Sequence, residues 1–597
     1  MEKGCLAVVL HTSLNRAWAL ALTVPELKHR LRNFFSKCLK AGIFPLSWKE
    51  SKLVLIKKPD RPEDSPSAYR PICLLDEIGK LFERIIAARL YEHLCSSGPD
   101  LSDKQFGFRR RRSTVDAILH VRSIAERATN SGKVALAVSL DIVNAFNSLP
   151  WDTIKDGLAH HNVPTYLRRI VDAYLQDRFI CYVTRGGQNH RRRTSCGVPQ
   201  GSVLGPMLWN FAYDAVLRVN LPRSVSVICY ADDTLLIAEG ESYREATHFA
   251  ELGISRVVNK IQDLGLKIAP HKTEALWFHK LPRRIEPPSS SLSVGNANVN
   301  IGLFIKYLGL TLDGRWDFGE HFDRLVPKLK RFAGYLQRLL PNLGGPSEEV
   351  RRLYAGIIRS MALYGAPVWA NRLLLQRIRR KVYSVQRIIS IRVVRGYRTI
   401  SYDASTLLAR YPPLDILALM DARIFCEIRS DSNISVDITD LRRQAHADAL
   451  ETWHYRLTQT KSARQRVVAA ILPNFHLWIK RRWGTITFRM TQIFTGHGCF
   501  GEYLHRIGRS SQENCHHCDA ICDSAQHTLE VCPAWAMQRM VLIQEIGSDL
   551  SLSAVINAML SSRSAWQSVQ NFCECIMLQK ESAERARERA NAGRRSR

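Results

Sequence analysis

The chain has 597 residues, 46% of them hydrophobic and 23% charged, which is ordinary for a folded protein and predicts about three to five structural units. Lysine and arginine number 85 against 55 aspartate and glutamate, a formal net charge of +30, which favours nucleic acid over a membrane as the partner. Because no apolar run is long enough to span a bilayer and no secretory signal is convincing, we expect an intracellular protein.

The first predicted elements alternate between helices and extended segments. An amphipathic helix is expected over residues 25–48, with Gly42 and Pro45 as stop signals, and a strand over 52–59. A Pro- and Asp-rich loop at 59–67, the segment 69–75 and a helix over 76–95 follow.

An arginine run, Arg109–Arg112, comes next after an aromatic pair. A solvated basic loop and a phosphate-binding segment both fit it, and we favour contact with a phosphate backbone.

Three carboxylates follow predicted β-rich runs. Residues 133–140 form a buried strand that ends on Asp141, and residues 225–238 form a hairpin whose turn holds Asp232 and Asp233. Adjacent carboxylates repel each other, and a divalent cation such as Mg²⁺ relieves that repulsion. One pair alone could be a solvated turn. With Asp141 at the end of a neighbouring strand, the set is what a two-metal phosphoryl-transfer site needs.

A glycine-rich loop lies between these carboxylates in the sequence. Residues 195–206 contain three glycines and two prolines, which predict a tight loop with exposed backbone, and a helix begins at Met207.

Taken in order, Asp141-x-x-x-Ala-Phe146, Gly197-Val-Pro-Gln-Gly201 and Tyr230-Ala-Asp-Asp233 resemble the palm motifs of reverse transcriptases, particularly those of non-LTR (LINE-type) retrotransposons. The resemblance covers roughly residues 25–535. It implies an α+β, right-hand polymerase with fingers, a palm built on an antiparallel sheet and a helical thumb. Residues 305–313 resemble the primer-grip hairpin of this family.

The resemblance also implies roles for individual residues. Asp141 and Asp232 would bridge two Mg²⁺ ions, with Asp233 weaker or indirect, and Lys272 could protonate the departing pyrophosphate. An exposed lysine without a catalytic role is the alternative interpretation of Lys272. The residues expected to contact nucleotide or template are Lys58, Arg70, Phe146, Gln200, Gly201 and Tyr230. Of these, Lys58 and Arg70 would grip the triphosphate and Phe146 would act as a steric gate against ribonucleotides. A surface ion pair for Arg70 and a core position for Phe146 are the alternatives.

A cysteine and histidine cluster near the C-terminus has zinc-knuckle spacing. Cys515, Cys518, His527 and Cys532 would hold one structural Zn²⁺, with Cys522, His516 and His517 as rival ligands. The remaining cysteines are mostly scattered singly and are expected to be reduced thiols.

The expected organisation is a helical lead-in at 1–50, fingers and palm at 51–317 and a thumb at 318–450. A zinc-binding region at 451–535 and a basic C-terminal helix or tail at 536–597 follow, and the tail from Lys580 onward is expected to be solvated.

The segment ahead of the knuckle resembles the type-I arthropod elements that insert in ribosomal RNA genes. That resemblance implies an RNA-directed DNA polymerase that copies element RNA from a primer in nicked target DNA, using deoxynucleoside triphosphates, in the nucleus at integration. It also implies that the chain is the C-terminal part of a polyprotein with an N-terminal endonuclease. A decayed copy that only binds nucleic acid, and a relative of group II intron maturases or telomerase, are the alternatives. The insertion target, the RNA recognised, the oligomeric state and the nucleic acid bound by the knuckle stay open.

Overall fold

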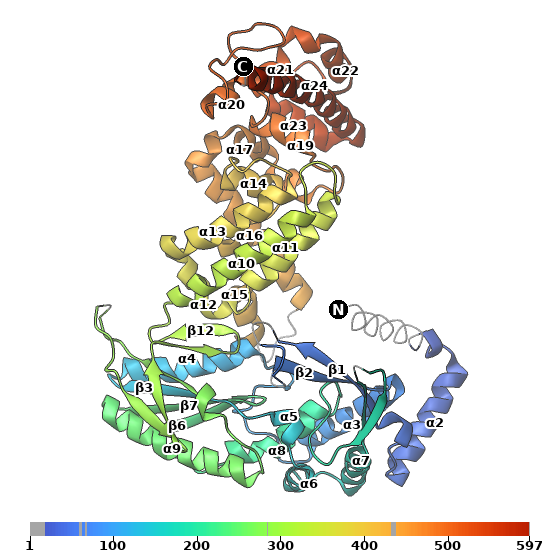
Figure 1. Ribbon diagram of the computed structural model, residues 1–597, viewed down its shortest axis with the longest axis vertical. Coiled ribbons are helices and arrows are strands. Elements are labelled where there is room, and N and C mark those ends of the chain that lie inside the picture. The colour runs from blue at the N-terminus through green and yellow to red at the C-terminus, as the bar shows by residue number, and fades with distance from the viewer. Residues whose placement is uncertain are drawn as a thin grey trace. The chain divides into compact units, whose positions relative to one another are not determined.

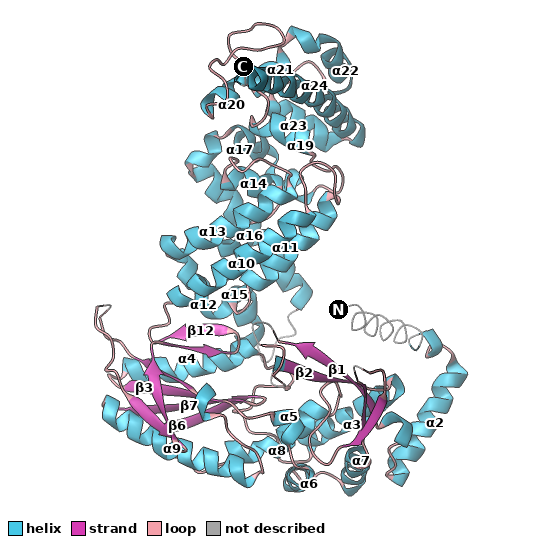
Figure 2. Cartoon of the chain, viewed as in Figure 1, coloured by secondary structure: helices cyan, strands magenta, loops and turns pink. Residues whose placement is uncertain are grey.

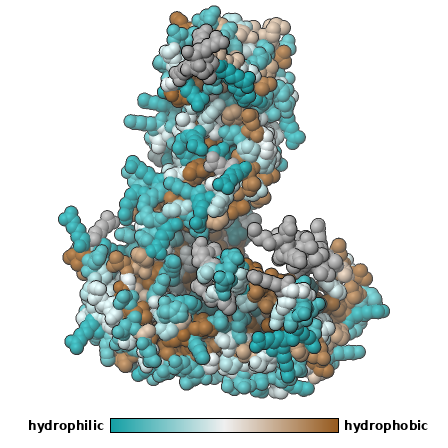
Figure 3. Space-filling model, in the orientation of Figure 1, coloured by the Kyte–Doolittle hydropathy of each residue, from teal (hydrophilic) through white to brown (hydrophobic). Residues whose placement is uncertain are grey.

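The computed structural model describes residue 18 and residues 20–58, 62–65, 68–184, 186–282, 284–430 and 437–595. The chain divides into two compact units, residues 1–317 and 318–597 (Figure 1). Within the described ranges, no helix is both long and apolar enough to cross a bilayer. Hydrophilic residues cover much of the face in Figure 3, with apolar residues scattered among them. Scattered apolar residues are normal for a folded surface.

Unit 1 is mixed α/β (Figure 2). Its strands are β1 (Glu50–Lys57), β2 (Tyr69–Leu74), β3 (Val134–Leu140), β4 (Phe179–Val183), β5 (Asn189–Arg193), β6 (Val225–Tyr230), β7 (Asp233–Gly240), β8 (Glu274–Phe278), β9 (Ser291–Val294), β10 (Ala297–Gly302), β11 (Phe304–Tyr307) and β12 (Leu310–Asp313). Its helices are α2 (Pro25–Ala41), α3 (Glu77–Ser96), α4 (Thr114–Asn130), α5 (Ala145–Ser148), α6 (Trp151–His160), α7 (Thr165–Leu175), α8 (Gly205–Leu217) and α9 (Tyr243–Asp263).

The strands of unit 1 form three sheets. The first has the order β2-β1-β4-β5, the second β6-β7-β3-β8-β10-β9, and β11 pairs with β12. In the second sheet β3 lies antiparallel to both β7 and β8, as expected for an antiparallel palm, whereas β8 and β10 are parallel. The residues of β3 are almost all apolar and buried, which suits a strand inside the sheet. Helices α4 and α9 pack against this sheet.

Helix boundaries in unit 1 follow their local signals. The helix predicted over 25–48 ends at Ala41, because Gly42 adopts the left-handed conformation (φ 70°). A 3₁₀ turn at Leu46–Trp48 replaces its last part. Helix α4 begins at a capping box in which the Ser113 and Asp116 side chains each bond the other's backbone N–H. The loop predicted at 59–67 falls largely outside the described residues.

The regular secondary structure of unit 2 is all helical within its described residues. Its α-helices are α10 (Gly319–Leu339), α11 (Glu348–Ala362), α12 (Ala366–Trp369), α13 (Gln376–Val393), α14 (Tyr402–Leu408), α15 (Leu414–Ser430), α16 (Ile438–Gln459), α17 (Arg466–Ile471), α18 (Phe475–Lys480), α19 (Phe488–Thr495), α20 (Gly501–Arg506), α21 (Ala525–Glu530), α22 (Ala536–Ile546), α23 (Leu552–Ser561) and α24 (Arg563–Arg595). The loop between α10 and α11 is held by the buried Arg351, whose guanidinium donates to the carbonyls of Pro341, Gly344 and Pro346.

The expectation of a solvated tail from Lys580 onward is wrong at its start. Lys580 and Glu581 lie inside α24 and are buried, with Lys580 only 1% exposed. The physical reason is that Phe572, Ile576 and Met577 pack the same helix into unit 2, so the chain cannot leave the core at residue 580. The Lys580 Nζ binds both oxygens of Asp523, at 2.9 and 2.8 Å.

Candidate active site

Strand pairing brings the three predicted carboxylates to one end of the second sheet. Asp141 follows directly after β3, and Leu140 at the end of β3 lies opposite Thr234 of β7. Asp232 lies in the two-residue turn between β6 and β7, and Asp233 is the first residue of β7, where it pairs with Tyr230. The turn is tight because Ala231 adopts a left-handed conformation, φ 59°, which is uncommon for a residue other than glycine.

The electrostatics of the turn favour a cation. Burial by the surrounding chain, then the charges of Asp232 and Asp141, raise the pKa of Asp233 to about 6. Burial and the charge of Asp141 also raise the pKa of Asp232. Carboxylates that repel one another in a crowded setting are a donor set for a hard, oxygen-binding cation, so these residues fit Mg²⁺.

Lys272 lies against the first carboxylate. Its Nζ is 2.5 Å from Asp141 Oδ2, and the Ala269 N–H donates to the Asp141 carbonyl at 2.8 Å. The short 3₁₀ turn Pro270–Lys272 holds the lysine there. An ammonium at this position is placed to exchange partners between Asp141 and an anionic ligand.

The glycine-rich loop is fastened on two sides. The Val198 N–H donates to the Phe146 carbonyl, and the Cys73 N–H of β2 donates to the Gln200 carbonyl, each at 2.8 Å. A Cβ at Gly197 would lie 2.5 Å from the Asn147 oxygen, and one at Gly201 would lie 2.6 Å from the Cys73 oxygen. Both positions also have positive φ, so only glycine lets the loop lie this close to both neighbours.

The remaining predicted contact residues lie around this loop and turn. Phe146 is half-buried and stacks on Trp209 of α8, with 5.1 Å between ring centroids. Gln200 and Tyr230 are half-buried and Gly201 is exposed. Lys58 and Arg70 lie on the other sheet, just after β1 and within β2, where Arg70 is exposed and pairs across the strands with Ile56.

Gln105 supports the turn at Ala231 and Asp232 and was not among the residues singled out from the sequence. It is 1% exposed, and its Oε1 accepts the backbone N–H groups of Ala231 and Gly107, each at 3.0 Å. The Phe106 N–H donates to the Cys229 carbonyl at 2.8 Å, so the segment lies alongside β6. A Cβ at Gly107 would lie 2.2 Å from the Ala231 nitrogen. A polar residue two positions before a glycine, inside an aromatic segment, was the available signal.

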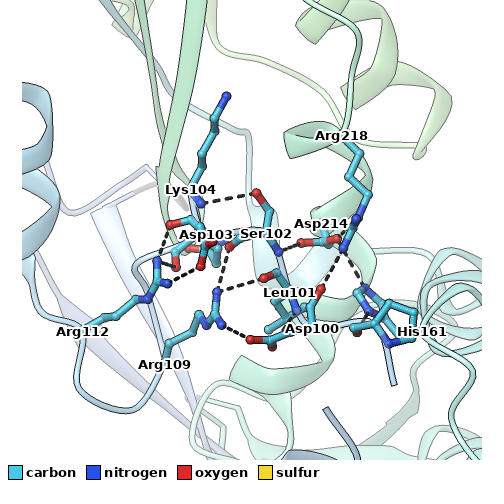
Figure 4. Close-up of polar contacts among 12 residues, drawn as sticks. Asp100, Leu101, Ser102, Asp103, Lys104, Arg109, Arg112, His161, Asp214 and Arg218 are labelled. Carbon is cyan, nitrogen blue, oxygen red and sulfur yellow. Dashed lines mark hydrogen bonds and ion pairs between the residues drawn. The ribbon is translucent and has the colours of Figure 1, made fainter. Parts of the chain in front are cut away.

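A polar network fixes the segment that carries Gln105 (Figure 4). The buried Asp214 of α8 accepts the Ser102 N–H at 2.7 Å and also binds His161 and Arg218. Arg109 donates to the carbonyls of Leu101 and Ser102 and to Asp100, and Arg112 pairs with Asp103 at 2.7 Å. These two arginines of the predicted phosphate-binding run therefore hold the loop, and the exposed members of the run are Arg110 and Arg111.

The predicted zinc ligands converge in unit 2. Cys515, Cys518, His527 and Cys532 place their ligand atoms within 4.8 Å of one another. The Cys518 Sγ lies 3.3 Å from His527 Nε2, and the two buried thiols Cys515 and Cys532 are 4.0 Å apart. Burial raises the pKa of Cys532 to about 12, so a thiolate at this position needs a cation. The rivals Cys522, His516 and His517 are not in this group.

Comparison with known proteins shows what the chain is similar to. Residues 56–312 match the family described as reverse transcriptase (RNA-dependent DNA polymerase), so this part of the chain carries a reverse transcriptase domain. The relatives that the chain matches include proteins of type-1 retrotransposable elements of arthropods, which confirms the resemblance inferred from the sequence.

Two relatives are type-1 element proteins and one is a transposon polymerase. The putative 115 kDa protein in type-1 retrotransposable element R1DM of Drosophila melanogaster is 28% identical, over 93% of this chain and 54% of that protein. The type-1 element R1 Pol polyprotein of Bradysia coprophila is 25% identical, over 84% and 50%. The probable RNA-directed DNA polymerase from transposon BS of Drosophila melanogaster is 30% identical, over 56% and 37%. The chain therefore spans about half the length of these relatives or less.

Among solved structures, a telomerase from Candida tropicalis in complex with a telomeric RNA fragment is similar over 70% of this chain and 68% of that chain. The sequence identity is 12% and the TM-score 0.34, too low to support an argument about function.

Proposed function

We propose that this chain is an RNA-directed DNA polymerase of a non-LTR retrotransposon. The observation that carries the proposal is the convergence of Asp141, Asp232 and Asp233 at one end of the sheet, inside the segment that matches the reverse transcriptase family. In this proposal unit 1 supplies fingers and palm, and the helices that open unit 2 supply the thumb.

The proposed reaction is nucleotidyl transfer to a primer 3′-hydroxyl. Mg²⁺ held by the three carboxylates would lower the pKa of that hydroxyl and neutralise charge on the triphosphate. Lys272, now paired with Asp141, would transfer its contact to the pyrophosphate and donate a proton as it leaves. The loop Gly197–Gly201 would present backbone to the template base and nucleotide, with Gln200 and Tyr230 beside them. Phe146 would exclude a ribose 2′-hydroxyl, while Lys58 and Arg70 would grip the triphosphate.

The partners follow from the same proposal. Element RNA would be the template, and nicked chromosomal DNA, in the nucleus, would provide the primer. The four-ligand group of three cysteines and one histidine would bind one structural Zn²⁺, whose preferred ligands are thiolate and imidazole. The chain would act as part of a longer polyprotein that also carries an endonuclease.

The test is deoxynucleotide incorporation on an RNA template with an annealed DNA primer and Mg²⁺. Asp232→Ala should abolish extension. Asp263→Ala, an exposed carboxylate at the end of α9, should not. Filter binding of the same primer–template by all three proteins separates catalysis from binding. Binding without extension by the unaltered chain would support a protein that only binds nucleic acid, and extension by Asp232→Ala would mean that the metal site is elsewhere.

A further inference from the structure

A second group of metal-ligating side chains lies in unit 2, apart from the four cysteine and histidine ligands described above. It consists of Glu451 and His454 on α16 and of His476 on α18, and their ligand atoms all lie within 4.8 Å of one another. Glu451 and His454 are three residues apart on one helix, so they share a face. The His476 Nε2 is 3.3 Å from Glu451 Oε1.

The two imidazoles are held by packing around one aromatic ring. Phe475, 1% exposed, stacks on His454 with 4.9 Å between centroids and an angle of 15° between planes. The fully buried Trp453 meets the same ring edge-on at 5.3 Å. The rings of His454 and His476 lie 5.5 Å apart at 78° to each other. Both imidazoles are therefore oriented by the core beneath them, although both remain partly open to solvent.

The spacing of the donor atoms suits a small transition-metal ion. Tetrahedral zinc with nitrogen and oxygen ligands at about 2.0–2.2 Å places neighbouring ligand atoms roughly 3.3–3.5 Å apart. The distance between His476 Nε2 and Glu451 Oε1 already has that value, and the other ligand atoms lie within 4.8 Å of one another. An ion pair between His476 and Glu451 explains that one contact, but it does not explain why His454 also presents its ring there.

We propose that Glu451, His454 and His476 form a second transition-metal site, with Zn²⁺ as its most fitting occupant and water in the fourth position. Two imidazoles and one carboxylate suit Zn²⁺, whereas Mg²⁺ and Ca²⁺ prefer ligand sets of oxygen alone. The ion would tie α16 to α18 across the segment 460–474. Because it would bind the folded arrangement only, it would stabilise this part of unit 2.

The experiment counts zinc in the full chain. Protein stripped by a chelator is reloaded with Zn²⁺, dialysed, and measured by elemental mass spectrometry. The double variant His454→Gln/His476→Gln should bind one equivalent fewer than the parent chain, whatever the content of the cysteine-containing site. His446→Gln, on the same helix but outside the group, should match the parent. Equal zinc content in the double variant and the parent would overturn the proposal.

Loading with Co²⁺ shows which of the two metal sites a variant has lost, and it distinguishes the loss of one site from general misfolding. In a chain that carries Cys515→Ser, Cys518→Ser and Cys532→Ser, which removes every thiolate of the first site, the weak visible absorption of Co²⁺ bound by nitrogen and oxygen should persist, and adding His454→Gln should remove it. Its persistence after His454→Gln would overturn the proposal. Glu451→Gln, which keeps size and shape, should weaken Zn²⁺ binding in competition with a chelator, and unchanged affinity would also count against the site. Helical circular dichroism checks the fold of each variant, and none of these readouts depends on polymerase activity.

Discussion

The side-chain amide of Gln105 brackets the backbone of Ala231 from both sides. Its Oε1 accepts the Ala231 N–H at 3.0 Å, and its Nε2 donates to the Ala231 carbonyl at 3.5 Å. Ala231 is the residue with positive φ immediately before Asp232 and Asp233. A left-handed conformation at such a residue costs about 1–3 kcal/mol and persists only where the surrounding structure enforces it. Gln105 therefore acts as a positioning residue for the two carboxylates.

Gln105→Leu should lower the turnover number for primer extension by about a hundredfold, the size expected for an ångström-scale displacement of catalytic groups. Primer–template binding should change little. Gln105→Glu, which keeps both acceptor contacts, should retain more activity than the leucine variant. Gln386→Leu removes an equally buried glutamine from unit 2 and serves as the control for general destabilisation. If Gln105→Leu reduces binding and turnover in parallel, the residue is merely structural.

Phe146→Val should relax discrimination between deoxy- and ribonucleotides. Forcing extra atoms into a packed site costs about 1–3 kcal/mol, and each 1.4 kcal/mol is tenfold, so we expect a change of roughly 10–100-fold. The measurement is the ratio of kcat/KM for dCTP and CTP. Phe108→Leu changes the neighbouring ring, 6.1 Å from that of Phe146, and should leave the ratio nearly unaltered. An unchanged ratio in Phe146→Val would assign that ring to the core alone.

Asp233→Asn should stabilise the metal-free turn between β6 and β7 and so slow its hydrogen exchange, while it lowers polymerase activity. The folded pKa of Asp233, about 6, lies above the usual value near 3.9, so its ionisation destabilises the fold. The protonated carboxyl of Asp233 therefore contributes stability that is fully present below about pH 4 and is lost as the pH rises through 6. Hydrogen exchange in peptides from β6 and β7 should therefore be slower in Asp233→Asn at pH 8, with the difference shrinking toward pH 4. Faster exchange at pH 8 would contradict the charge repulsion, and Asp263→Asn is the matched control.

Lys580→Met should loosen the cysteine-rich turn of unit 2. Removing the lysine leaves Asp523 buried without a counter-charge, at a cost of about 3–5 kcal/mol. Asp523 also accepts the Gly501 N–H at 3.0 Å, so the disturbance reaches the segment ahead of Cys515. Zn²⁺ loaded at the site that includes Cys515 should then transfer to a chelator faster in Lys580→Met than in the unaltered chain.

The double variant Lys580→Met/Asp523→Asn should recover part of the stability lost in Lys580→Met, because no charge is left buried. Arg589→Met, at an exposed position of the same helix, is the control. Equal rates of zinc loss in Lys580→Met and Arg589→Met would mean that the buried pair does not support the turn.

The sequence by itself determined the parts of this protein that depend on local order and residue type. The strand before Asp141, the hairpin around Asp232 and Asp233, and the glycine loop all occur where their patterns predict them, because apolar alternation and turn residues act over a few neighbours. The match to the reverse transcriptase family covers the same strings. The sequence did not predict that Arg109 and Arg112 contact their own loop. These contacts depend on Asp100 and Asp103, which the fold brings next to them.

Only the tertiary structure decided which distant residues meet. Gln105 reaches Ala231 across 126 positions, and Lys580 meets Asp523 across 57. His476 joins Glu451 and His454 because α18 packs back on α16 through Phe475. Such contacts depend on how elements pack. A buried glutamine or lysine looks like any surface residue in sequence, because its partner is supplied by another part of the chain.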